Sequence, residues 1–463
     1  MVTVNPAIFR KYDIRGVVDT DVTEELVAEL GRAIGTMARR AGQETFALGY
    51  DARLHSPRLH DALLGGLVSC GLEVWDLGMA PTPLVYYAVF RFKLGGGVVI
   101  TGSHNPPEFN GFKIMVGEGT LHGEQIQELR RMIEEGDFDA ASGGAVREVD
   151  ALTPYLEEVA GDMELGAWPE GRALRVVVDA GNGAAGVVAE PLLRRLGLDV
   201  VAKYIEPDGH FPNHHPDPSE PENVEALIEA VREEGADLGV AYDGDGDRIG
   251  VVDEQGQIIW GDRLMILFSR ALLKEEPGAT IVGEVKCSQT MYDDIRAHGG
   301  DAIMWRVGHS LIKSKMKESG ALLAGEVSGH IFFKHRWYGF DDAVYATARL
   351  VELVTRMGGP VSSLLSDVPE TFATPELRVE TRDEVKFAIA ERVAGVLEGE
   401  GHEVVTIDGV RVIYEDGWGL VRASNTQPAL VLRAEAQSPE RRDAIEASLR
   451  ARVREAEAAL MDS

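Results

Sequence analysis

The segment Thr101–Lys113, TGSHNPPEFNGFK, carries the clearest chemical pattern of this chain. It places the pair Ser103–His104 in an Asn-Pro-Pro turn that directly follows the apolar run GGGVVI. Prolines restrict the backbone of such a turn, so the hydroxyl lies on a stiff loop. Serine is a weak nucleophile at neutral pH and must be activated or arrive already phosphorylated. The pattern therefore predicts covalent chemistry at Ser103.

A second chemical pattern alternates three carboxylates, Asp243, Asp245 and Asp247, with glycines. Its spacing is similar to the start of an EF-hand calcium loop, but Arg248 stands where that loop needs glycine, and the flanking runs are typical of strands. The glycines let the carboxylates converge, and their mutual repulsion favours a bound divalent cation. Magnesium takes oxygen ligands and leaves a position for a phosphate oxygen, which suits phosphoryl transfer.

The segment GEVSGH offers groups that suit a sugar. Glu326 supplies an acceptor and Ser328 a donor and acceptor, between glycines that let a ligand approach the backbone. His330 is a candidate general acid or base, although a core histidine bonded to the backbone is a common alternative.

The segment RASNTQP near the C-terminus suits a phosphate. Arg422 supplies a charged fork, and the short side chains of Ser424, Asn425 and Thr426, with adjacent backbone N–H groups, can enclose the anion. A plain hairpin turn is the alternative. Arg433 is a further candidate contact.

Alternating apolar and amphipathic runs predict the elements that position these residues. Strand-like runs and helix-length stretches alternate from about residue 45 to residue 357, the pattern of βαβ units with mixed, largely parallel sheets. The alternation restarts twice, which predicts three similar α/β domains. Closely spaced strand-like runs after residue 376 predict a fourth, α+β domain with an antiparallel sheet flanked by two helices. We expect domains at 1–150, 151–255, 256–367 and 368–463, with junctions in GDFDAASGGAVREVD and DVPETFATP.

The composition excludes several classes of partner. The 463 residues include 46 basic and 76 acidic side chains, and a formal charge of −30 disfavours nucleic acid and anionic membranes. Any site for an anionic substrate must therefore be positive locally. The two cysteines, Cys70 and Cys287, are too few for a disulfide framework, and we expect buried thiols. With no apolar run of membrane-spanning length and no signal core, we expect a cytoplasmic protein.

The run GNGAAG, Gly181–Gly186, satisfies the dinucleotide-binding fingerprint, and Glu206 follows at a fitting distance. Taken alone, it would indicate an NAD-dependent oxidoreductase. Glycines at a turn from strand to helix also serve close packing without any ligand. We favour this packing interpretation and keep the oxidoreductase as a remote alternative.

Four motifs in the same chain order resemble those of the α-D-phosphohexomutases, in particular the bacterial phosphomannomutase/phosphoglucomutase branch. They are TGSHNPPEFNGFK, DGDGDR, GEVSGHIFFKHRWYGFDDA and GWGLVRASNTQPALVLR. The resemblance extends from Phe9 to about Glu435. It implies reversible interconversion of hexose 1-phosphate and hexose 6-phosphate, with mannose and glucose as the sugars. Phosphorylated Ser103 would donate its phosphoryl group, form a hexose 1,6-bisphosphate and take back the other phosphate.

The resemblance also implies roles for single residues. Mg²⁺ would be held by the phosphorylated Ser103 with Asp243, Asp245 and Asp247, and glucose 1,6-bisphosphate would act as activator. Arg15, Lys113 and Arg248 would face the moving phosphoryl group, while the role of His104 stays open. Glu326 and Ser328 would bind adjacent sugar hydroxyls, and RASNTQP would be the phosphate clamp. Less specific matches indicate further substrate contacts at Tyr12, Lys286 and His309.

Two alternative functions share part of this pattern. Phosphoglucosamine mutases usually have Glu-Gln-Ser where this chain has Glu326-Val327-Ser328, so we place that activity second. A phosphosugar-binding protein without turnover would keep the clamp but lose the serine or the aspartates, and this chain has both. We expect small-molecule hexose phosphates as partners, and a monomer or weak homo-oligomer.

Overall fold

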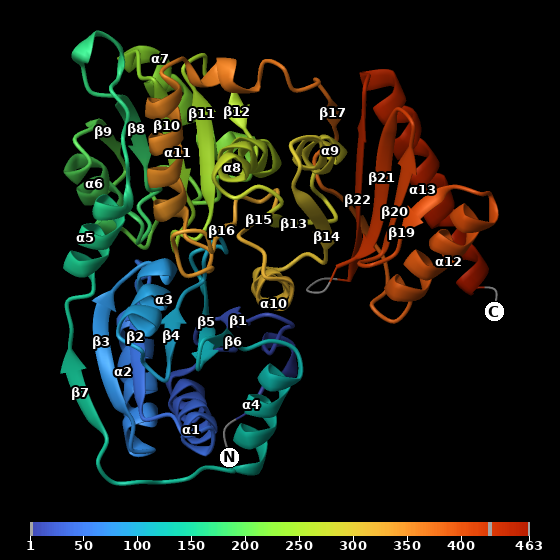
Figure 1. Cartoon of the computed structure of the whole chain (residues 1–463). Helices are drawn as coiled ribbons and strands as arrows, with labels where there is room; N and C mark the ends of the chain where they lie inside the picture. The colour runs from blue at the N-terminus through green and yellow to red at the C-terminus, as the bar shows by residue number, and fades with distance from the viewer. Residues whose placement is uncertain (1–2, 425–427, 462–463) are drawn as a thin grey trace. The chain divides into compact units, whose positions relative to one another are not determined.

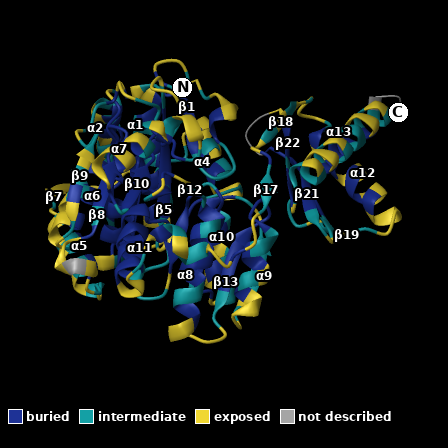
Figure 2. Cartoon of the chain, turned by 90° about the horizontal axis from the view of Figure 1, so that it is seen from above, coloured by how far each residue is buried: buried dark blue, intermediate teal, exposed yellow. Residues whose placement is uncertain are grey.

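The apolar runs that the sequence predicts as strands form mostly buried sheets in the computed structural model (Figures 1 and 2). The structure describes residues 3–424 and 428–461. The chain divides into two units: the first comprises Met1–Leu272 and Leu322–Leu365, the second Leu273–Ala321 and Ser366–Ser463. The Ser103 loop and the aspartate loop belong to the first unit, and Arg422 to the second.

The first sheet has the order β1-β5-β4-β2-β3-β7, with β6 paired to β5. Its strands are β1 (Ile14–Val17), β2 (Thr45–Tyr50), β3 (Glu73–Met79), β4 (Gly96–Ile100), β5 (Phe109–Val116), β6 (Gly119–Thr120) and β7 (Ala145–Glu148). Strand β2 is parallel to β3 and β4, whereas β5 is antiparallel to β4 and β1. The Ser103 loop therefore leaves the carboxyl end of β4, beside the carboxyl end of β2.

Helices α1 (Glu24–Arg40), α2 (Ser56–Ser69), α3 (Thr82–Arg91) and α4 (Glu124–Glu135) complete this domain. Thr23 caps α1 by accepting a hydrogen bond from the N–H of Leu26. Helix α1 packs against α2 and α4, and α3 against β2 and β4 (Figure 1). A Cβ at Gly66 would lie 2.8 Å from the Cα of Gly31, so glycines are needed where α1 and α2 touch.

The second sheet has the order β12-β11-β10-β8-β9. Its strands are β8 (Arg175–Asp179), β9 (Asp199–Lys203), β10 (Leu238–Tyr242), β11 (Ile249–Asp253) and β12 (Ile258–Ile259), and the neighbouring helices are α5 (Leu152–Asp162), α6 (Gly186–Arg195), α7 (Glu225–Glu234), α8 (Gly261–Glu275) and α11 (Ala343–Met357). The aspartate loop joins the antiparallel strands β10 and β11. Strands on both sides confirm that it is no EF-hand. The hairpin of β15 (Leu323–Gly325) and β16 (Ile331–Phe333) carries residues 326–330.

The second unit contains a parallel pair and an antiparallel sheet. Strands β13 (Thr280–Glu284) and β14 (Asp301–Trp305) are parallel and joined through α9 (Gln289–Ala297), and α10 (His309–Ser319) follows. The sheet has the order β17-β22-β21-β20-β19, with β18 paired to β22. Its elements are β17 (Phe372–Ala373), β18 (Leu377–Glu380), β19 (Glu403–Val405), β20 (Val410–Tyr414), β21 (Gly417–Ala423) and β22 (Ala429–Ala436), with α12 (Lys386–Gly399) and α13 (Pro439–Met461). Both helices pack against this sheet, as predicted.

Two predicted junctions contain short strands. Residues 145–148 of the first form β7, which pairs with β3, and residues 372–373 of the second form β17, which pairs with β22. These pairings use backbone groups, which the side-chain pattern does not report.

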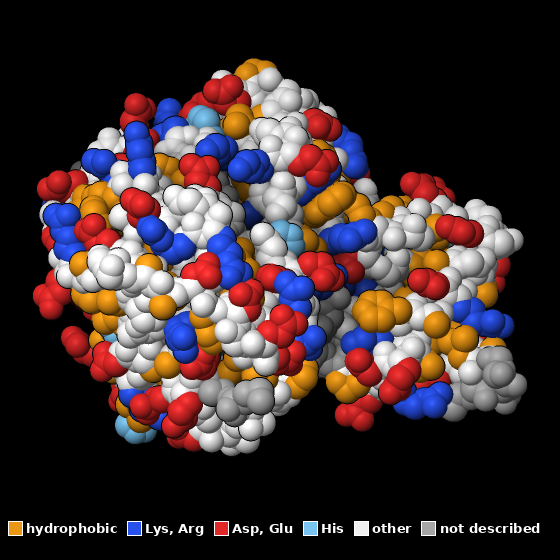
Figure 3. Space-filling view, turned by 90° about the horizontal axis from the view of Figure 1, so that it is seen from below, with side chains coloured by type: hydrophobic (Ala, Val, Ile, Leu, Met, Phe, Trp, Pro, Cys, Tyr) orange, Lys and Arg blue, Asp and Glu red, His pale blue; other side chains and the backbone are white. Residues whose placement is uncertain are grey.

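The surface and the cysteines agree with the composition. Acidic and basic side chains are interspersed on the face drawn in Figure 3. Cys70 and Cys287 are buried thiols, as predicted. Within residues 3–424 and 428–461, no helix combines the length and the apolarity needed to cross a membrane.

Candidate active site

Ser103 lies buried in a strained backbone conformation. Its φ of 48° is in the left-handed region, which costs a non-glycine residue about 1–3 kcal/mol. Contacts with the surrounding structure must offset this cost. Its N–H donates to Thr101 Oγ1 at 2.7 Å. A Cβ at Gly244 of the aspartate loop would lie 2.4 Å from the Ser103 carbonyl oxygen, so the two loops are in direct contact.

The hydroxyl of Ser103 donates to Asp243 Oδ2 at 2.7 Å, and His104 Nδ1 lies 3.0 Å from the same hydroxyl oxygen. Because the hydroxyl has a single proton, His104 Nδ1 must act as the donor to Ser103. Burial, together with the positive charges of Arg248 and Arg15, holds the pKa of His104 well below its usual range. A neutral His104 therefore orients the serine in this arrangement.

The three aspartates converge as predicted, and each is completely buried. One carboxylate oxygen from each can be chosen so that all lie within 4.8 Å of one another. Thr82 Oγ1 donates to Asp245 Oδ2 at 2.5 Å, and Lys113 Nζ forms ion pairs with Asp245 and Asp247. Asp245 Oδ1 and Asp247 Oδ1 are buried and accept no hydrogen bond from any residue that the structure describes. Buried carboxylate oxygens that lack donors fit a divalent cation.

The charges of this cluster act strongly on one another. Burial and repulsion from Asp245 raise the pKa of Asp243 and of Asp247. Burial opposes ionisation of Asp245 as well, but Lys113 outweighs it and lowers the pKa of that carboxyl. Burial likewise opposes the charge of Lys113, and the two carboxylates still raise its pKa well above the usual value. An additional cation would relieve the repulsion that remains.

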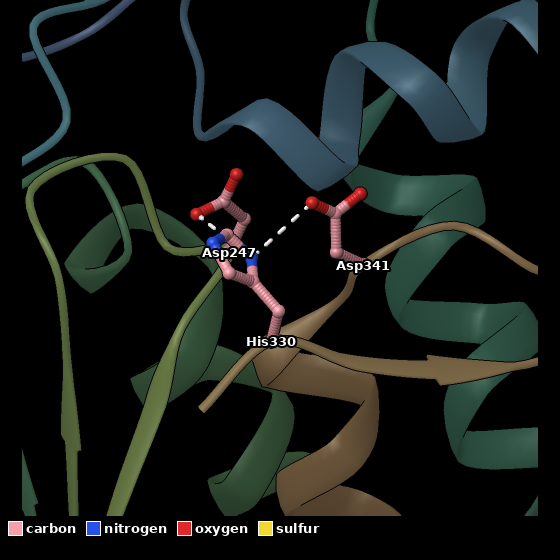
Figure 4. Close-up of side chains that lie close together, drawn as sticks. All are labelled: Asp247, His330 and Asp341. Atoms are coloured by element: carbon pink, nitrogen blue, oxygen red, sulfur yellow. Dashed lines mark ion pairs between the residues drawn. The ribbon is translucent and has the colours of Figure 1, made fainter. Parts of the chain in front are cut away.

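His330 lies against the aspartate loop (Figure 4). Arg248 Nε donates to His330 Nε2 at 3.1 Å, so Nε2 is the acceptor and the ring proton of the neutral histidine is on Nδ1. Nδ1 faces two carboxylates, 3.3 Å from Asp341 Oδ2 and 3.6 Å from Asp247 Oδ1. The basic ring atom is therefore Nε2, which would have to release the Arg248 N–H before it takes a proton.

The structure brings Arg15 to the Ser103 loop. Arg15 Nη1 donates to Asn105 Oδ1 at 2.6 Å, and Nη2 forms an ion pair with Asp13 at 2.6 Å. Tyr12 lies in the turn before β1, its ring 5.7 Å from the ammonium of Lys11.

Glu326 is buried and Ser328 half-buried in the turn between β15 and β16. The backbone of this turn approaches its neighbours closely, since a Cβ at Gly261 would lie 2.3 Å from the Glu326 carbonyl oxygen.

In the second unit, the candidate phosphate-binding residues Lys286 and Arg422 each contact a carboxylate. Lys286 Nζ lies 2.9 Å from Glu376 Oε1. Lys286 first, and Arg422 and Arg433 in addition, lower the pKa of Glu376 to about 2, although burial opposes them. Asp408 Oδ2 accepts from Arg422 at 3.1 and 3.3 Å. With Arg433, the cations of this region outnumber these two carboxylates by one.

Two further predicted residues, His309 and Ser424, lie in the same unit. Asp408 also accepts from the N–H of Val307 at 3.1 Å, two residues before His309, which begins α10. Ser424 is buried directly after β21. Asn425 and Thr426 lie outside the described residues.

Comparison with known proteins covers nearly the whole chain. Family models described as phosphoglucomutase/phosphomannomutase α/β/α domains I, II and III and C-terminal domain match residues 6–140, 153–256, 260–372 and 376–452. Phosphomannomutase/phosphoglucomutase of Pseudomonas aeruginosa is 48% identical over 99% of this chain and 98% of that protein. A phosphoglucomutase/phosphomannomutase family structure from Burkholderia thailandensis has a TM-score of 0.92 at 41% identity, covering 98% of both chains.

This chain belongs to the phosphoglucomutase/phosphomannomutase family. It is an enzyme that interconverts hexose 1-phosphates and hexose 6-phosphates. Its fold, three mixed and largely parallel α/β sheets with an antiparallel C-terminal sheet, is that of the phosphohexomutases.

Two further solved structures share the fold at low identity and contain ligands. One is the S69A variant of Aspergillus fumigatus N-acetylphosphoglucosamine mutase in complex with glucose 1,6-bisphosphate, with a TM-score of 0.61 at 14% identity over 98% of this chain and 97% of that one. The other is the same fungal enzyme with GlcNAc-6P and magnesium, with a TM-score of 0.59 at 15% identity over 96% and 94%.

In this phosphohexomutase the GNGAAG run serves packing. A Cβ at Gly183 would lie 2.8 Å from the Gly244 carbonyl oxygen, and one at Gly186 would lie 2.0 Å from the Ile205 carbonyl oxygen. The run thus supports the aspartate loop, in agreement with the packing interpretation.

Several residues at the site were missed in the sequence. Asp51 and Arg53 contact the Ser103 loop, Thr82 contacts Asp245, and Asp217 lies 3.7 Å from Arg248. A usable signal existed for Asp51 and Arg53 alone, because they follow β2, whose carboxyl end must lie beside that of β4 if the two strands are parallel neighbours.

Proposed function

We propose that this enzyme transfers phosphate through phosphorylated Ser103 and a hexose 1,6-bisphosphate intermediate. The observation that carries the proposal is the hydrogen bond from Ser103 Oγ to Asp243, which holds the hydroxyl at a buried carboxylate cluster surrounded by Arg15, Lys113 and Arg248. Such transfers depend mainly on positioning and on stabilising charge.

In the first transfer, the bond between phosphorus and Ser103 Oγ breaks while a bond forms from phosphorus to the free hydroxyl oxygen of the hexose phosphate. The hydroxyl proton passes to a general base, for which we propose His330: Asp341 and Asp247 lie on the Nδ1 side of its ring, and Nε2 would release the Arg248 N–H to take the proton. The base then gives up a proton that completes the Ser103 hydroxyl, so the transfer has no net proton change. After the intermediate turns around, the same groups run the reverse step with the other phosphate. Lys113 and Arg248 stabilise charge on the moving group.

We further propose Mg²⁺ as the cofactor and glucose 1,6-bisphosphate as activator. Asp243, Asp245 and Asp247, with an oxygen of the Ser103 phosphate, would hold the ion, which would offset negative charge on the phosphoryl group. The unpartnered carboxylate oxygens support this assignment, as do the magnesium and bisphosphate ligands of the fungal relatives.

The substrate contacts follow the division of the chain. We propose four domains: 1–150 with the phosphoserine loop, 151–255 with the metal loop, 256–367 with the sugar loop and 368–463 with the phosphate clamp. Glu326 and Ser328 would bind sugar hydroxyls. Phosphate and neighbouring sugar atoms would be bound by Tyr12, Lys286, His309, Arg422, Ser424, Asn425, Thr426 and Arg433. A cytoplasmic enzyme that is monomeric or weakly associated stays a prediction.

The deciding experiment compares intact mass and turnover for wild type, Ser103→Ala and Ser269→Ala. Ser269 is a buried serine of α8 and serves as the matched control. Wild type and Ser269→Ala should carry one phosphate, whereas Ser103→Ala should carry none and lose turnover by orders of magnitude. Near-normal turnover of Ser103→Ala would contradict the covalent mechanism.

A coupled assay with mannose, glucose and glucosamine 1-phosphates side by side tests the sugar. Mannose and glucose differ away from the hydroxyls that we assign to Glu326 and Ser328, so both should react. A preference between them beyond about 1,000-fold, about 4 kcal/mol of transition-state discrimination, would require another contact.

A further inference from the structure

We propose that Arg53 is a positioning residue for phosphoryl transfer, whose guanidinium imposes the conformation of the Ser103 loop. The proposal rests on the proposed phosphoserine mechanism. Arg53 is 1% exposed and follows β2, the strand that is parallel to β4 and ends beside it.

The guanidinium of Arg53 donates almost entirely to main-chain carbonyls of this one loop. Nη2 donates to the carbonyl oxygens of Ser103 at 2.9 Å and Asn105 at 2.5 Å, and Nη1 to those of Pro106 at 2.5 Å and Phe109 at 3.0 Å. Nε donates to Asp51 Oδ2 at 3.2 Å. All five N–H groups of an arginine are thereby accounted for. A planar fork with this many donors cannot be replaced by a lysine ammonium.

Asp51 fixes both the arginine and the start of the loop. It is buried and accepts from the N–H of Arg53 at 3.0 Å and from the N–H of Gly102 at 3.0 Å. Ser56 Oγ donates at 2.6 Å to Asp51 Oδ1, the oxygen that also accepts from the Arg53 N–H. The carboxylate therefore links the guanidinium to the residue that precedes Ser103.

The space around the guanidinium is closed on two sides. A Cβ at Gly102 would lie 2.3 Å from Arg53 Nε, so no larger residue fits there without displacing the fork. On the other side, the ring of Phe211 lies 5.3 Å from the Arg53 guanidinium carbon. Arg53 thus has a single position, and the loop that it bonds has one as well.

The loop needs such a partner because its carbonyls do not belong to a helix or a strand ladder, except at Phe109. Ser103 is a buried residue, and its carbonyl would be costly to leave without a donor. Asn105 and Phe109 are half-buried, and the exposed Pro106 also accepts from the N–H of Phe109 at 3.0 Å. Ser103 itself adopts a left-handed φ of 48°, which persists only where the surroundings over-determine it. Without the Arg53 fork the loop would relax, and the Ser103 oxygen would leave the carboxylate cluster.

The experiment measures kcat, KM and melting midpoint for Arg53→Lys, Arg53→Gln and the control Arg58→Gln. Arg58 is a partly exposed neighbour on α2 that pairs with Asp19 and Glu24. Because misplacing a reacting atom by about 1 Å costs about 100-fold in rate, Arg53→Gln should lose about that factor in kcat, with KM changed by less than about threefold. Arg53→Lys should not restore kcat, and Arg58→Gln should match wild type.

A folded Arg53→Gln with kcat within twofold of wild type would overturn the proposal, as would a rise in KM at unchanged kcat. If the Arg53 variants do not fold, Gly102→Ala is the second probe, since its methyl group displaces the fork without removing it. It should lower kcat while KM is kept, and wild-type kcat in this variant would refute the inference. The phosphoserine mechanism is tested separately, because Ser103→Ala would still carry no phosphate in that case.

Discussion

Lys113 and Asp245 form a buried ion pair in which Nζ lies 2.6 Å from Oδ2. Lys113 also pairs with Asp247, so a single ammonium is shared by two of the three aspartates. The lysine on β5 of the first sheet is therefore part of the charge balance of the loop between β10 and β11. The stability of the first unit should therefore depend on the cation that the aspartates bind.

Lys113→Met should make stability strongly dependent on magnesium. Removing one partner of a buried ion pair costs about 3–5 kcal/mol, because the other charge is left uncompensated. A bound divalent cation would offset part of that charge, so added Mg²⁺ should raise the melting midpoint of Lys113→Met more than that of wild type. Thermal unfolding in EDTA and in excess Mg²⁺ measures both shifts, with the exposed Lys93→Met as control. Equal magnesium shifts in the three proteins would argue against the shared site.

Chelation should abolish activity, and Mg²⁺ should restore it. Asp245→Asn should weaken metal binding more than it weakens folding, since removing one of three repelling carboxylates also relieves strain in the empty cluster. Magnesium titration calorimetry and the melting midpoint separate these effects, and the exposed Asp199→Asn is the matched control. Full turnover in excess EDTA would exclude the metal assignment.

The sequence predicts the Ser103 loop and the aspartate loop well, because each is a contiguous motif whose chemistry is local. Most strands were predictable too, since buried strands are apolar runs. Arg53 was missed although its place after β2 was a usable signal, because an arginine after a strand is usually a surface charge, and its burial arises from carbonyls about 50 residues away. Asp341 was missed for a similar reason. Its neighbour Asp342 caps α11 by accepting from the N–H of Tyr345, whereas Asp341 lies against His330, and the sequence does not distinguish the two roles.

The pair of buried His60 and half-buried Asp76 should give the first unit a pH-dependent stability. His60 Nε2 lies 3.0 Å from Asp76 Oδ1. Burial opposes the charge of His60, but Asp76 outweighs it and raises the pKa of the imidazole. Burial likewise opposes ionisation of Asp76, and His60 lowers the pKa of that carboxyl on balance.

The direction of the pH dependence follows from these two pKa shifts. A raised histidine pKa contributes stability that is complete below the unfolded value of about 6.5 and is lost as pH rises through the folded value. The melting midpoint of wild type should therefore fall relative to that of His60→Gln between pH 6 and pH 9. A constant difference between the two proteins over this range would show that His60 is neutral in the folded state.

Arg422→Ala should release the bisphosphate intermediate. With one active serine, the intermediate must loosen and turn so that its second phosphate reaches Ser103, and a clamp must recapture the other end. The chain passes from the first to the second unit at residues 365–366, directly before the segment DVPETFATP, and we expect this connection to allow the opening. Loss of charge-assisted bonds to phosphate should cost about 1.5–3 kcal/mol, which weakens substrate binding by about 10- to 150-fold.

The same variant should leave the enzyme dephosphorylated and dependent on added glucose 1,6-bisphosphate. The measurement is the steady-state rate against activator concentration, with escaped bisphosphate quantified, for wild type, Arg422→Ala and the partly exposed Arg441→Ala, which pairs with Asp416. Asp408→Asn should show the same defect in weaker form, because Asp408 holds the Arg422 fork through two contacts with one oxygen. If Arg422→Ala binds substrate weakly but needs no more activator and leaks no more intermediate, then Arg422 binds the substrate without retaining the turning bisphosphate.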